Sequence, residues 1–545
     1  QSLTEYVLRI VAVAAVTAGP AAVASGAVMA ALWAAWGGHG GAARPLGDLS
    51  AANTIGGVAG AVTAGFVAIP LLGVRETWLI VAVSYLILAD IIANGTNGLK
   101  PLAYAALVAI VIVNPMRIPL VNLRPDSETL RAMLEGPSGI VTVVETADDV
   151  QLRLDNYYVL GGSAAATNER RLGLIPLLLH PGPRRAAFIG LATGITASAG
   201  PALGLDETTA IEIVPEVAKA ARAYFSAWNA RLLEQPSVTL VVDDGRRYLG
   251  AGREQYDAIV SDLFVPWHAG AGSLYSREMY QTVRRRLAAN GLFCQWLPLY
   301  QLTHEEFDMI ARTFLSVFPH VSLWRADFYP NRPVVGLVGQ VDAQPIDLEQ
   351  VSRRVDRMPD WARDSLLAAP RGFVMLYVGD LSATTDLFAG APLNTDDRPR
   401  LEFLAPRLTR MNADGDKDWF TGDALTAFYD TLDSRMSKQA NPFVGDADSV
   451  IAARRAGTAL YKYALAATRH DDAWARHWQA QVSELVPEVI ANAQSAAPMT
   501  EPTTDLTDAR RGLADLRERQ REVRSQLDVL EHRLKQLSNA EGLRQ

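Results

Sequence analysis

The sequence predicts an α/β domain with a mainly parallel sheet, preceded by transmembrane helices and followed by a helical region and a coiled coil. Three observations carry this prediction: long apolar stretches between residues 10 and 116, alternation of short apolar runs with helical segments over residues 186–338, and a heptad pattern near the C-terminus. Strands that alternate with helices are typical of a parallel sheet covered by helices. We expect these domains: membrane helices 1–118, a β-rich lead-in 119–165, the α/β domain 166–410, a helical region 411–500 and a coiled coil 501–545.

The N-terminal region has the composition of membrane-spanning helices. Between Tyr6 and Met116 only seven residues are charged. Because a bilayer core of about 30 Å takes about 20 helical residues, we expect about four spans; buried core helices are the alternative. The chain opens on Gln1 directly before an apolar stretch, so we expect the natural N-terminus and further helices upstream. The four apolar stretches are 10–36, 51–72, 77–94 and 101–116.

Positive charge follows the last of these stretches. Arg117, Arg124 and Arg131 come directly after it, and cytoplasmic loops next to a span are enriched in such residues. We therefore expect a multi-pass protein of the cell inner membrane, in contact with membrane lipid, whose α/β domain lies in the cytoplasm.

Composition excludes several classes of site. The 545 residues carry 51 basic and 59 acidic side chains, a formal charge of −8, whereas a general nucleic-acid binder needs a basic face. The single cysteine, Cys294, excludes an intrachain disulfide and a cysteine-based zinc site. The histidines lack metal-ligand spacing, so we expect no metal and no nucleic acid.

The middle of the chain reads as strands and helices. Alternating residues over 139–160 predict a β-hairpin or meander. Apolar runs then predict strands at 186–191, 209–213, 238–242, 256–262, 291–297 and 334–338, with helices at 215–230, 276–289 and 305–318.

Small or acidic residues fall where four of these strands end. In an open parallel sheet, ligands bind beyond the carboxyl ends of the strands. The small residues of the turn 190–194 allow close backbone approach, and a carboxylate at Glu212 can accept hydrogen bonds from both ribose hydroxyls. Asp244 suits an adenine amine, and Asp262 would face the reacting group. Together they predict a site for an adenosine-containing ligand.

At these residues the chain resembles the spermidine synthase (polyamine aminopropyltransferase) family, and more narrowly its membrane-embedded members. The resemblance covers about residues 136–339. It rests on the following stretches: HPGPRRAAFIGLATGIT (180–196), IEIVPEVAKAAR (211–222), DDGRRYL (243–249), YDAIVSDLFVPWHAGAGSLYSREMY (256–280), GLFCQWLPLY (291–300), and, for the membrane-fused relatives, NTDDRPRLEF (394–403) and LSAANTIGGVAGAVTAGF (49–66).

The resemblance implies a Rossmann-like, methyltransferase-type sheet and a transferase. Such an enzyme would move an aminopropyl group from decarboxylated S-adenosylmethionine to a small amine, without a metal. Asp262 would be the catalytic aspartate. By the same resemblance Gly190, Gly194, Glu212, Asp244 and Gly245 would bind the nucleoside, and Gln295, Trp296 and Tyr329 the substrate.

Several family positions are not kept. An aspartate of the Gly-rich turn is Thr193 here, the second cleft aspartate is Val265, a glutamine falls on Val159, and a Tyr-His-Glu cluster falls on residues 168–170, which begin with Asn168. Two alternatives therefore stay open: a methyltransferase that uses intact S-adenosylmethionine, and a catalytically decayed structural subunit of a membrane complex.

Three other features have two interpretations each. Cys294 is a buried core thiol or a nucleophile, and His268 lines the cleft or lies on the surface. The pair Asp396-Asp397 closes over the site or forms a turn before a strand that starts near Arg400.

The C-terminal region is expected to be helical over 419–493 and to end in a coiled coil. Nine of ten seam positions are apolar, at alternating spacings of three and four, which is the pattern of a coiled coil. We expect a homo-oligomer or a partner protein at this helix; packing on its own chain is the alternative. The seam is Leu506, Ala509, Leu513, Leu516, Gln520, Val523, Leu527, Leu530, Leu534 and Leu537.

Overall fold

A computed structural model describes residues 3–19, seven residues between 22 and 32, residues 43–93, and residues 119–487 except 126, 157, 414–417 and 437–440. The predicted span at 101–116 and the predicted coiled coil at 501–545 lie outside the described residues.

The N-terminal region is helical where it is described. Its helices are α1 (Leu3–Thr17), α3 (Ala43–Thr63), α4 (Ile69–Leu72) and α5 (Val74–Ala93), with a π-helical turn at Ala64–Ala68 between α3 and α4. Within the described ranges, one helical stretch, Gly47–Leu72, is long and apolar enough to cross a membrane, and none of its apolar window is buried. The prediction of about four spans is therefore not confirmed beyond this one candidate.

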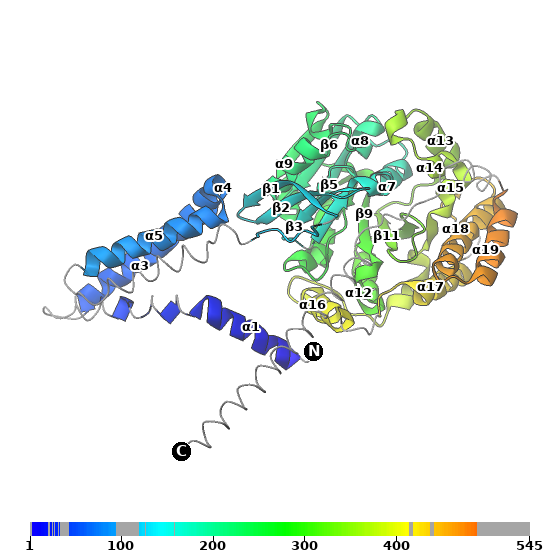
Figure 1. Cartoon of the computed structure of the whole chain (residues 1–545). Coiled ribbons are helices and arrows are strands. Elements are labelled where there is room, and N and C mark those ends of the chain that lie inside the picture. Colours follow the sequence, from blue (N-terminus) through cyan, green and yellow to red (C-terminus); the bar gives the residue numbers. More distant parts are fainter. Residues whose placement is uncertain are drawn as a thin grey trace, which may run out of the picture. The chain divides into compact units, whose positions relative to one another are not determined.

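The lead-in is a four-stranded antiparallel meander. Its strands run in the order β1 (Thr129–Gly136), β2 (Gly139–Glu145), β3 (Val150–Leu154) and β4 (Tyr158–Gly162). Alternating apolar residues of this sheet, Val141 and Val143 among them, pack on Val217 and Phe225 of the helix α9 (Pro215–Tyr224) and its end. The meander is thereby attached to the larger sheet through α9 (Figure 1).

The larger sheet has eight strands and is mixed. Five strands are mutually parallel, in the spatial order β9-β8-β5-β6-β7, and β11, β10 and β13 continue the sheet as antiparallel neighbours beyond β9. The strands are β5 (Arg185–Ile189), β6 (Glu207–Glu212), β7 (Val238–Val242), β8 (Tyr256–Ser261), β9 (Leu287–Pro298), β10 (His320–Arg325), β11 (Val334–Gln340) and β13 (Tyr377–Asp380).

Two strands of this edge, β10 and β13, were not predicted. The sheet is mixed because β11 already pairs antiparallel with β9, and these two strands add two more antiparallel pairings. The sequence HVSLWR of β10 alternates only weakly, and β13 is four residues long. A separate two-stranded sheet pairs β12 (Ile346–Asp347) with β14 (Phe443–Val444) in parallel.

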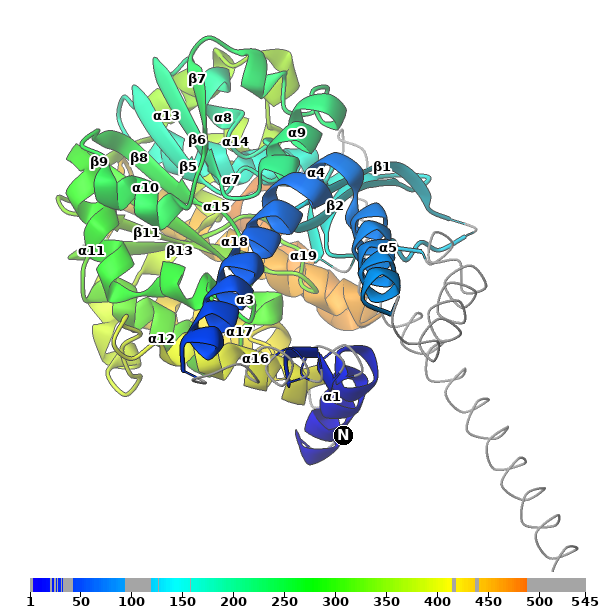
Figure 2. The same cartoon turned by 90° about the vertical axis from the view of Figure 1, so that its left-hand side faces the viewer.

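The strand order reverses direction at β5, and this position defines the site. From β5 the chain moves outward to β6 and β7, then returns to β8 on the other side of β5 and continues to β9. The crossings run through α8 (Ala199–Ala202), α9, α10 (Gly245–Ala251) and α11 (Arg277–Arg286). Because such crossovers are right-handed, the helices before and after the reversal cover opposite faces. Figure 2 shows β5 between β8 and β6. Ligands of such sheets bind beyond the strand ends at the reversal, so the ends of β5 and β8 are the expected ligand position.

The remaining helices enclose the sheet. Helices α17 and α18 pack beside β13, and α19 packs on α18; α18 and α19 form the orange edge of the domain in Figure 1. The bounds are α7 (Ala166–Leu179), α12 (His304–Leu315), α13 (Leu348–Asp356), α14 (Ser365–Ala368), α15 (Pro370–Met375), α16 (Arg400–Ala413), α17 (Gly422–Arg435), α18 (Ala447–Thr468) and α19 (Asp472–Leu485).

The strand expected from Arg400 onward is a helix instead. In α16, Leu401 and Ala405 are fully buried while Phe403 is 75% exposed. Burial at positions i and i+4 is the helical period; the short motif RLEFL also fits a strand period, which explains the wrong prediction.

Candidate active site

The turn after β5 is held by Glu212 from the end of β6. One oxygen of the Glu212 carboxylate accepts hydrogen bonds from the N–H groups of Leu191 (3.1 Å) and Ala192 (3.3 Å). The other accepts from Val214 N–H at 2.9 Å. Burial raises the pKa of Glu212, and these backbone donors offset part of that rise. Glu212 thus holds the Gly-rich turn at which the sequence predicts the nucleoside.

The backbone of this turn is left-handed at three positions. Gly190 (φ 90°), Ala192 (φ 47°) and Gly194 (φ 79°) all have positive φ. Glycine adopts such angles without cost, whereas Ala192 is strained, and strain of this kind is held only where surrounding contacts impose it. A side chain at Gly190 would come within 3.4 Å of Asp262 and 3.5 Å of Phe264, so the turn and the end of β8 are in close approach.

Asp262 lies directly beside this turn. Its N–H donates to the carbonyl of Ile189 at 3.0 Å, and its carboxylate accepts from Leu263 N–H at 2.8 Å. Burial raises the pKa of Asp262 to about 6, with a further contribution from the charge of Glu212. A carboxylate that titrates near 6 is ionised at neutral pH yet basic enough to accept a proton, as general-base catalysis requires.

A second carboxylate of the site was missed by the sequence reasoning. Glu169 of α7 accepts a hydrogen bond from the Thr193 hydroxyl at 2.6 Å and from Gly162 N–H at 2.9 Å. Burial first, and the negative charge of Asp262 among smaller causes, raise the pKa of Glu169 to about 7. The Gly-rich turn lacks an acid at Thr193, but Glu169 brings a carboxylate to the same place from another helix.

The two carboxylates are expected to titrate together. When Asp262 is replaced by asparagine, the neighbouring negative charge disappears, ionised Glu169 becomes more favourable, and the pKa of Glu169 should fall from about 7. Burial persists in the variant, so the pKa should stay above the ordinary glutamate value. Titration of the side-chain carboxyl carbons by NMR measures this. An unchanged Glu169 pKa would mean that the two groups do not interact.

The predicted adenine-side residues begin α10. Asp244 is exposed and caps this helix, since its side chain accepts from Arg247 N–H at 2.9 Å. Gly245 is required for packing, because a side chain there would come within 2.5 Å of Ile189. Asp244 therefore lies at the rim, whereas Gly190, Glu212 and Asp262 form the closely packed part of the site.

The three predicted substrate residues differ in their burial and in their hydrogen bonds. Trp296 is fully buried and its indole N–H donates to Leu172 O at 2.8 Å, so it supports the sheet from within. Gln295 is also fully buried, and its side-chain oxygen has no hydrogen-bond partner. Tyr329 is half-buried in the loop after β10, where its N–H donates to the Asp327 carboxylate at 3.0 Å.

Asp327 and Tyr158 are further groups that sequence reasoning missed. Burial raises the pKa of Asp327 to about 6, although the positive charges of Arg171 and Arg332 act against the rise. Burial also raises the pKa of Tyr158. Its strand β4 approaches the Gly-rich turn, because a side chain at Gly161 would come within 2.9 Å of Thr193. No spacing in the sequence links these residues, because they come from separate loops and sheets.

Three positions that depart from the family pattern are buried or half-buried. Val265 is buried and brings no charge, and Val159 is half-buried in β4 opposite Arg153. Asn168 is half-buried in α7, one residue before Glu169.

The remaining candidates follow their simpler interpretations. Cys294 is fully buried, and burial raises its thiol pKa, which opposes a nucleophilic role. His268 is exposed. Among the described residues, no three His, Cys, Asp or Glu side chains gather so as to hold a metal ion.

Comparisons with known proteins point to one family. A model of the spermine/spermidine synthase domain matches residues 167–327, which run from α7 to the loop after β10. Polyamine aminopropyltransferase 2 of Hyperthermus butylicus is 30% identical over 156 residues, covering 28% of this chain and 51% of the relative. Polyamine aminopropyltransferase of Erwinia tasmaniensis is 29% identical over 153 residues, covering 28% and 53%. The chain spans about half the length of these curated relatives.

Among solved structures, spermidine synthase from Thermotoga maritima is similar with 19% identity and a TM-score of 0.38, covering 42% of this chain and 79% of that chain. The matched residues 167–327 contain the turn at Gly190, Glu212, Asp244 and Asp262. Residues 167–327 of this chain are therefore similar to the spermine/spermidine synthase domain, and the similar curated proteins are polyamine aminopropyltransferases.

Proposed function

We propose that the protein is a spermidine synthase-like transferase that moves an aminopropyl group from decarboxylated S-adenosylmethionine to a small amine. The observation that carries this proposal is the direct approach of Asp262 to the Gly-rich turn at the reversal of strand order. That position suits a group that reacts with a nucleoside held by the turn.

The chemistry is a single displacement. The amine nitrogen of the acceptor attacks the aminopropyl carbon bound to the sulfonium sulfur, a C–N bond forms, and the C–S bond breaks. Its electron pair goes to sulfur, which becomes a neutral thioether. The acceptor must be deprotonated, and Asp262 takes that proton. Most of the remaining rate enhancement comes from holding the two reactants in line.

The carboxylate of Glu169 favours the decarboxylated donor over the intact one. It is hydrogen-bonded to Thr193 in the Gly-rich turn. Its ionised form, which predominates above the pKa of about 7, would repel the carboxylate of intact S-adenosylmethionine. The same charge attracts the ammonium of an aminopropyl group. The methyltransferase alternative rested on the absence of an acid at Thr193, and Glu169 supplies that acid.

Binding of the two sulfonium nucleosides tests this proposal. We expect the purified full chain to bind decarboxylated S-adenosylmethionine at least tenfold more tightly than the intact form, because a like-charge contact costs more than about 1.4 kcal/mol. Isothermal titration calorimetry measures both affinities. Tighter binding of the intact nucleoside would favour a methyltransferase, and binding of neither would favour a structural subunit.

We further propose that the chain is anchored in the inner membrane with the α/β domain in the cytoplasm. Support comes from the exposed apolar helix Gly47–Leu72 and from the arginines that follow residue 116. The heptad pattern of residues 506–537 supports assembly with a second copy or a partner helix.

A further inference from the structure

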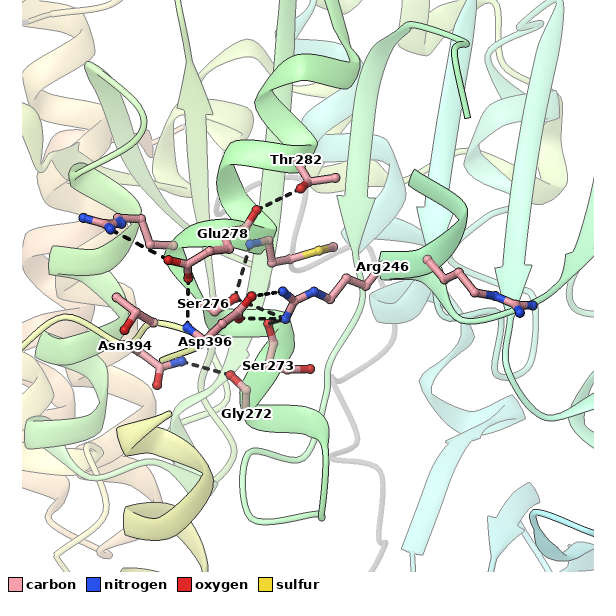
Figure 3. A network of polar contacts seen from close by, with 12 residues as sticks. Arg246, Gly272, Ser273, Ser276, Glu278, Thr282, Asn394 and Asp396 are labelled. Carbon is pink, nitrogen blue, oxygen red and sulfur yellow. Dashed lines mark hydrogen bonds and ion pairs between the residues drawn. The ribbon is translucent and has the colours of Figure 1, made fainter. Parts of the chain in front are cut away.

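The loop that follows Asp262 is held by a segment more than one hundred residues further along the chain. We call residues 263–276 the site loop and residues 394–402 the strap. Side chains of Asn394 and Glu402 join the two segments directly. Arg246 of α10 binds Asp396 of the strap and Ser273 of the site loop (Figure 3).

Asn394 fixes the base of the strap. Its side-chain N–H donates to Gly272 O at 2.9 Å, and its side-chain oxygen accepts from Leu401 N–H at 3.1 Å. Its backbone N–H donates to the Thr313 hydroxyl at 2.9 Å, and its carbonyl accepts from Arg277 N–H at 3.0 Å. Asn394 is fully buried, so each of these bonds is shielded from water and costly to lose.

Glu402 binds the site loop from the first turn of α16. Its carboxylate accepts from Gly270 N–H at 2.6 Å and from Gly272 N–H at 3.0 Å. A side chain at Gly272 would come within 2.8 Å of the Glu402 backbone nitrogen. The loop thus approaches α16 so closely that only glycine fits.

Asp396 connects the strap to the helix that Asp244 caps. Arg246, two residues after Asp244, forms a two-point ion pair with the Asp396 carboxylate, with one N–O distance of 2.9 Å. The same guanidinium donates to Ser273 O at 3.2 Å and to the Ser276 hydroxyl at 3.4 Å, both in the site loop. Burial alone would raise the pKa of Asp396, but the hydrogen bonds from Arg246 and Ser276 lower it overall.

The site loop transmits this anchoring to the Gly-rich turn. The Tyr275 hydroxyl, on a fully buried side chain, donates to Phe264 O at 2.9 Å. The ring of Phe264 lies 3.5 Å from where a side chain at Gly190 would begin. A loop fixed at Gly270–Ser276 therefore keeps Phe264 against the turn. A cavity of about 260 Å³ lies beside the ion pair of Arg246 and Asp396.

We infer that Asn394, Asp396 and Glu402 are positioning residues that fix the site loop and α10 together, so that the two sides of the nucleoside site keep one arrangement. The inference rests on the proposed function in one respect only: the affinity measurement that tests it uses the proposed nucleoside. The competing interpretation is that the strap merely stabilises the fold.

Charge reversal of the Arg246–Asp396 pair tests the inference. In the full-length protein, Arg246→Asp and Asp396→Arg should each speed hydrogen exchange of residues 263–276 and weaken binding of decarboxylated S-adenosylmethionine about fivefold or more. The double variant restores an opposite-charge pair and should recover most of both losses. Reversing the exposed pair of Arg469, which follows α18, with Asp423 of α17 is the matched control and should change neither.

The outcomes separate the possibilities. Unchanged exchange of residues 263–276 in both single variants would overturn the inference, as would a double variant no better than the single ones. Exchange that rises equally throughout the domain would mean a purely stabilising role. If the wild type does not bind the nucleoside, the proposed function fails, but the exchange measurements still decide whether the strap orders the loop.

Discussion

Replacing Asp262 with asparagine is expected to lower kcat for aminopropyl transfer by about a hundredfold or more, which is the low end of the range for losing a general base. The donor affinity should change little, because Asp262 lies at the reacting side of the turn while Glu212 holds its other side. Single-turnover assays with the decarboxylated donor measure the rate, and calorimetry measures the affinity.

The asparagine variant has a matched control on the same strand. Asp257 lies at the opposite end of β8, where its carboxylate accepts from Arg184 N–H at 2.8 Å and Arg185 N–H at 3.0 Å. Asp257→Asn should leave kcat near the wild-type value. A full rate in Asp262→Asn would show that another group accepts the proton, and Glu169, with a pKa near 7, would be the next to test.

The pH dependence follows from the same group. The folded-state pKa of Asp262 is about 6, above the ordinary value, so protonation removes the base as pH falls through 6. The value of kcat/KM should therefore decline on the acid side below about pH 6, and this limb should be missing in Asp262→Asn.

The sequence predicted the part of the site that depends on strand order. Each strand end was visible as an apolar run followed by a small or acidic residue, and parallel neighbours bring these ends to one edge. Gly190, Glu212 and Asp262 are indeed adjacent in the structure through the contacts of the Gly-rich turn. Local pattern and topology agree here, so the predicted adjacency of these residues is confirmed, while their roles in binding and catalysis stay predictions.

Contacts between distant segments could not be predicted in this way. Glu169 reaches Thr193 from an earlier helix, and Asp396 reaches Arg246 across 150 positions. Neither pair has a periodicity or a fixed spacing. The segment RLEFL forms a helix, in which Leu401 and Ala405 are buried against the domain. Five residues are too few to distinguish a helical period from a strand period in the sequence.

Replacing Glu212 with glutamine is expected to weaken donor binding about thirtyfold or more. Hydrogen bonds to a charged group contribute about 1.5–3 kcal/mol each, and the ribose would lose one charged acceptor. The amide would also keep only one acceptor oxygen. Its NH2 group would face either Val214 N–H or the N–H groups of Leu191 and Ala192, which the carboxylate now satisfies. Calorimetry with the decarboxylated nucleoside measures the affinity.

A structural role alone would give a different pattern from a ribose-binding role. If Glu212 only shapes the turn, Glu212→Gln should lower Tm and kcat together, while the KM for the donor stays near the wild-type value. If it also holds the ribose, the KM should rise far more than kcat falls, because the lost interaction is made in the bound ground state as well as in the transition state.

Glu207→Gln serves as the control, since Glu207 begins the same strand and pairs with Arg185 at the surface at 2.8 Å. Such exposed pairs contribute about 1 kcal/mol at most. A donor KM unchanged in both variants would leave Glu212 as a support of the turn and remove it from the nucleoside site.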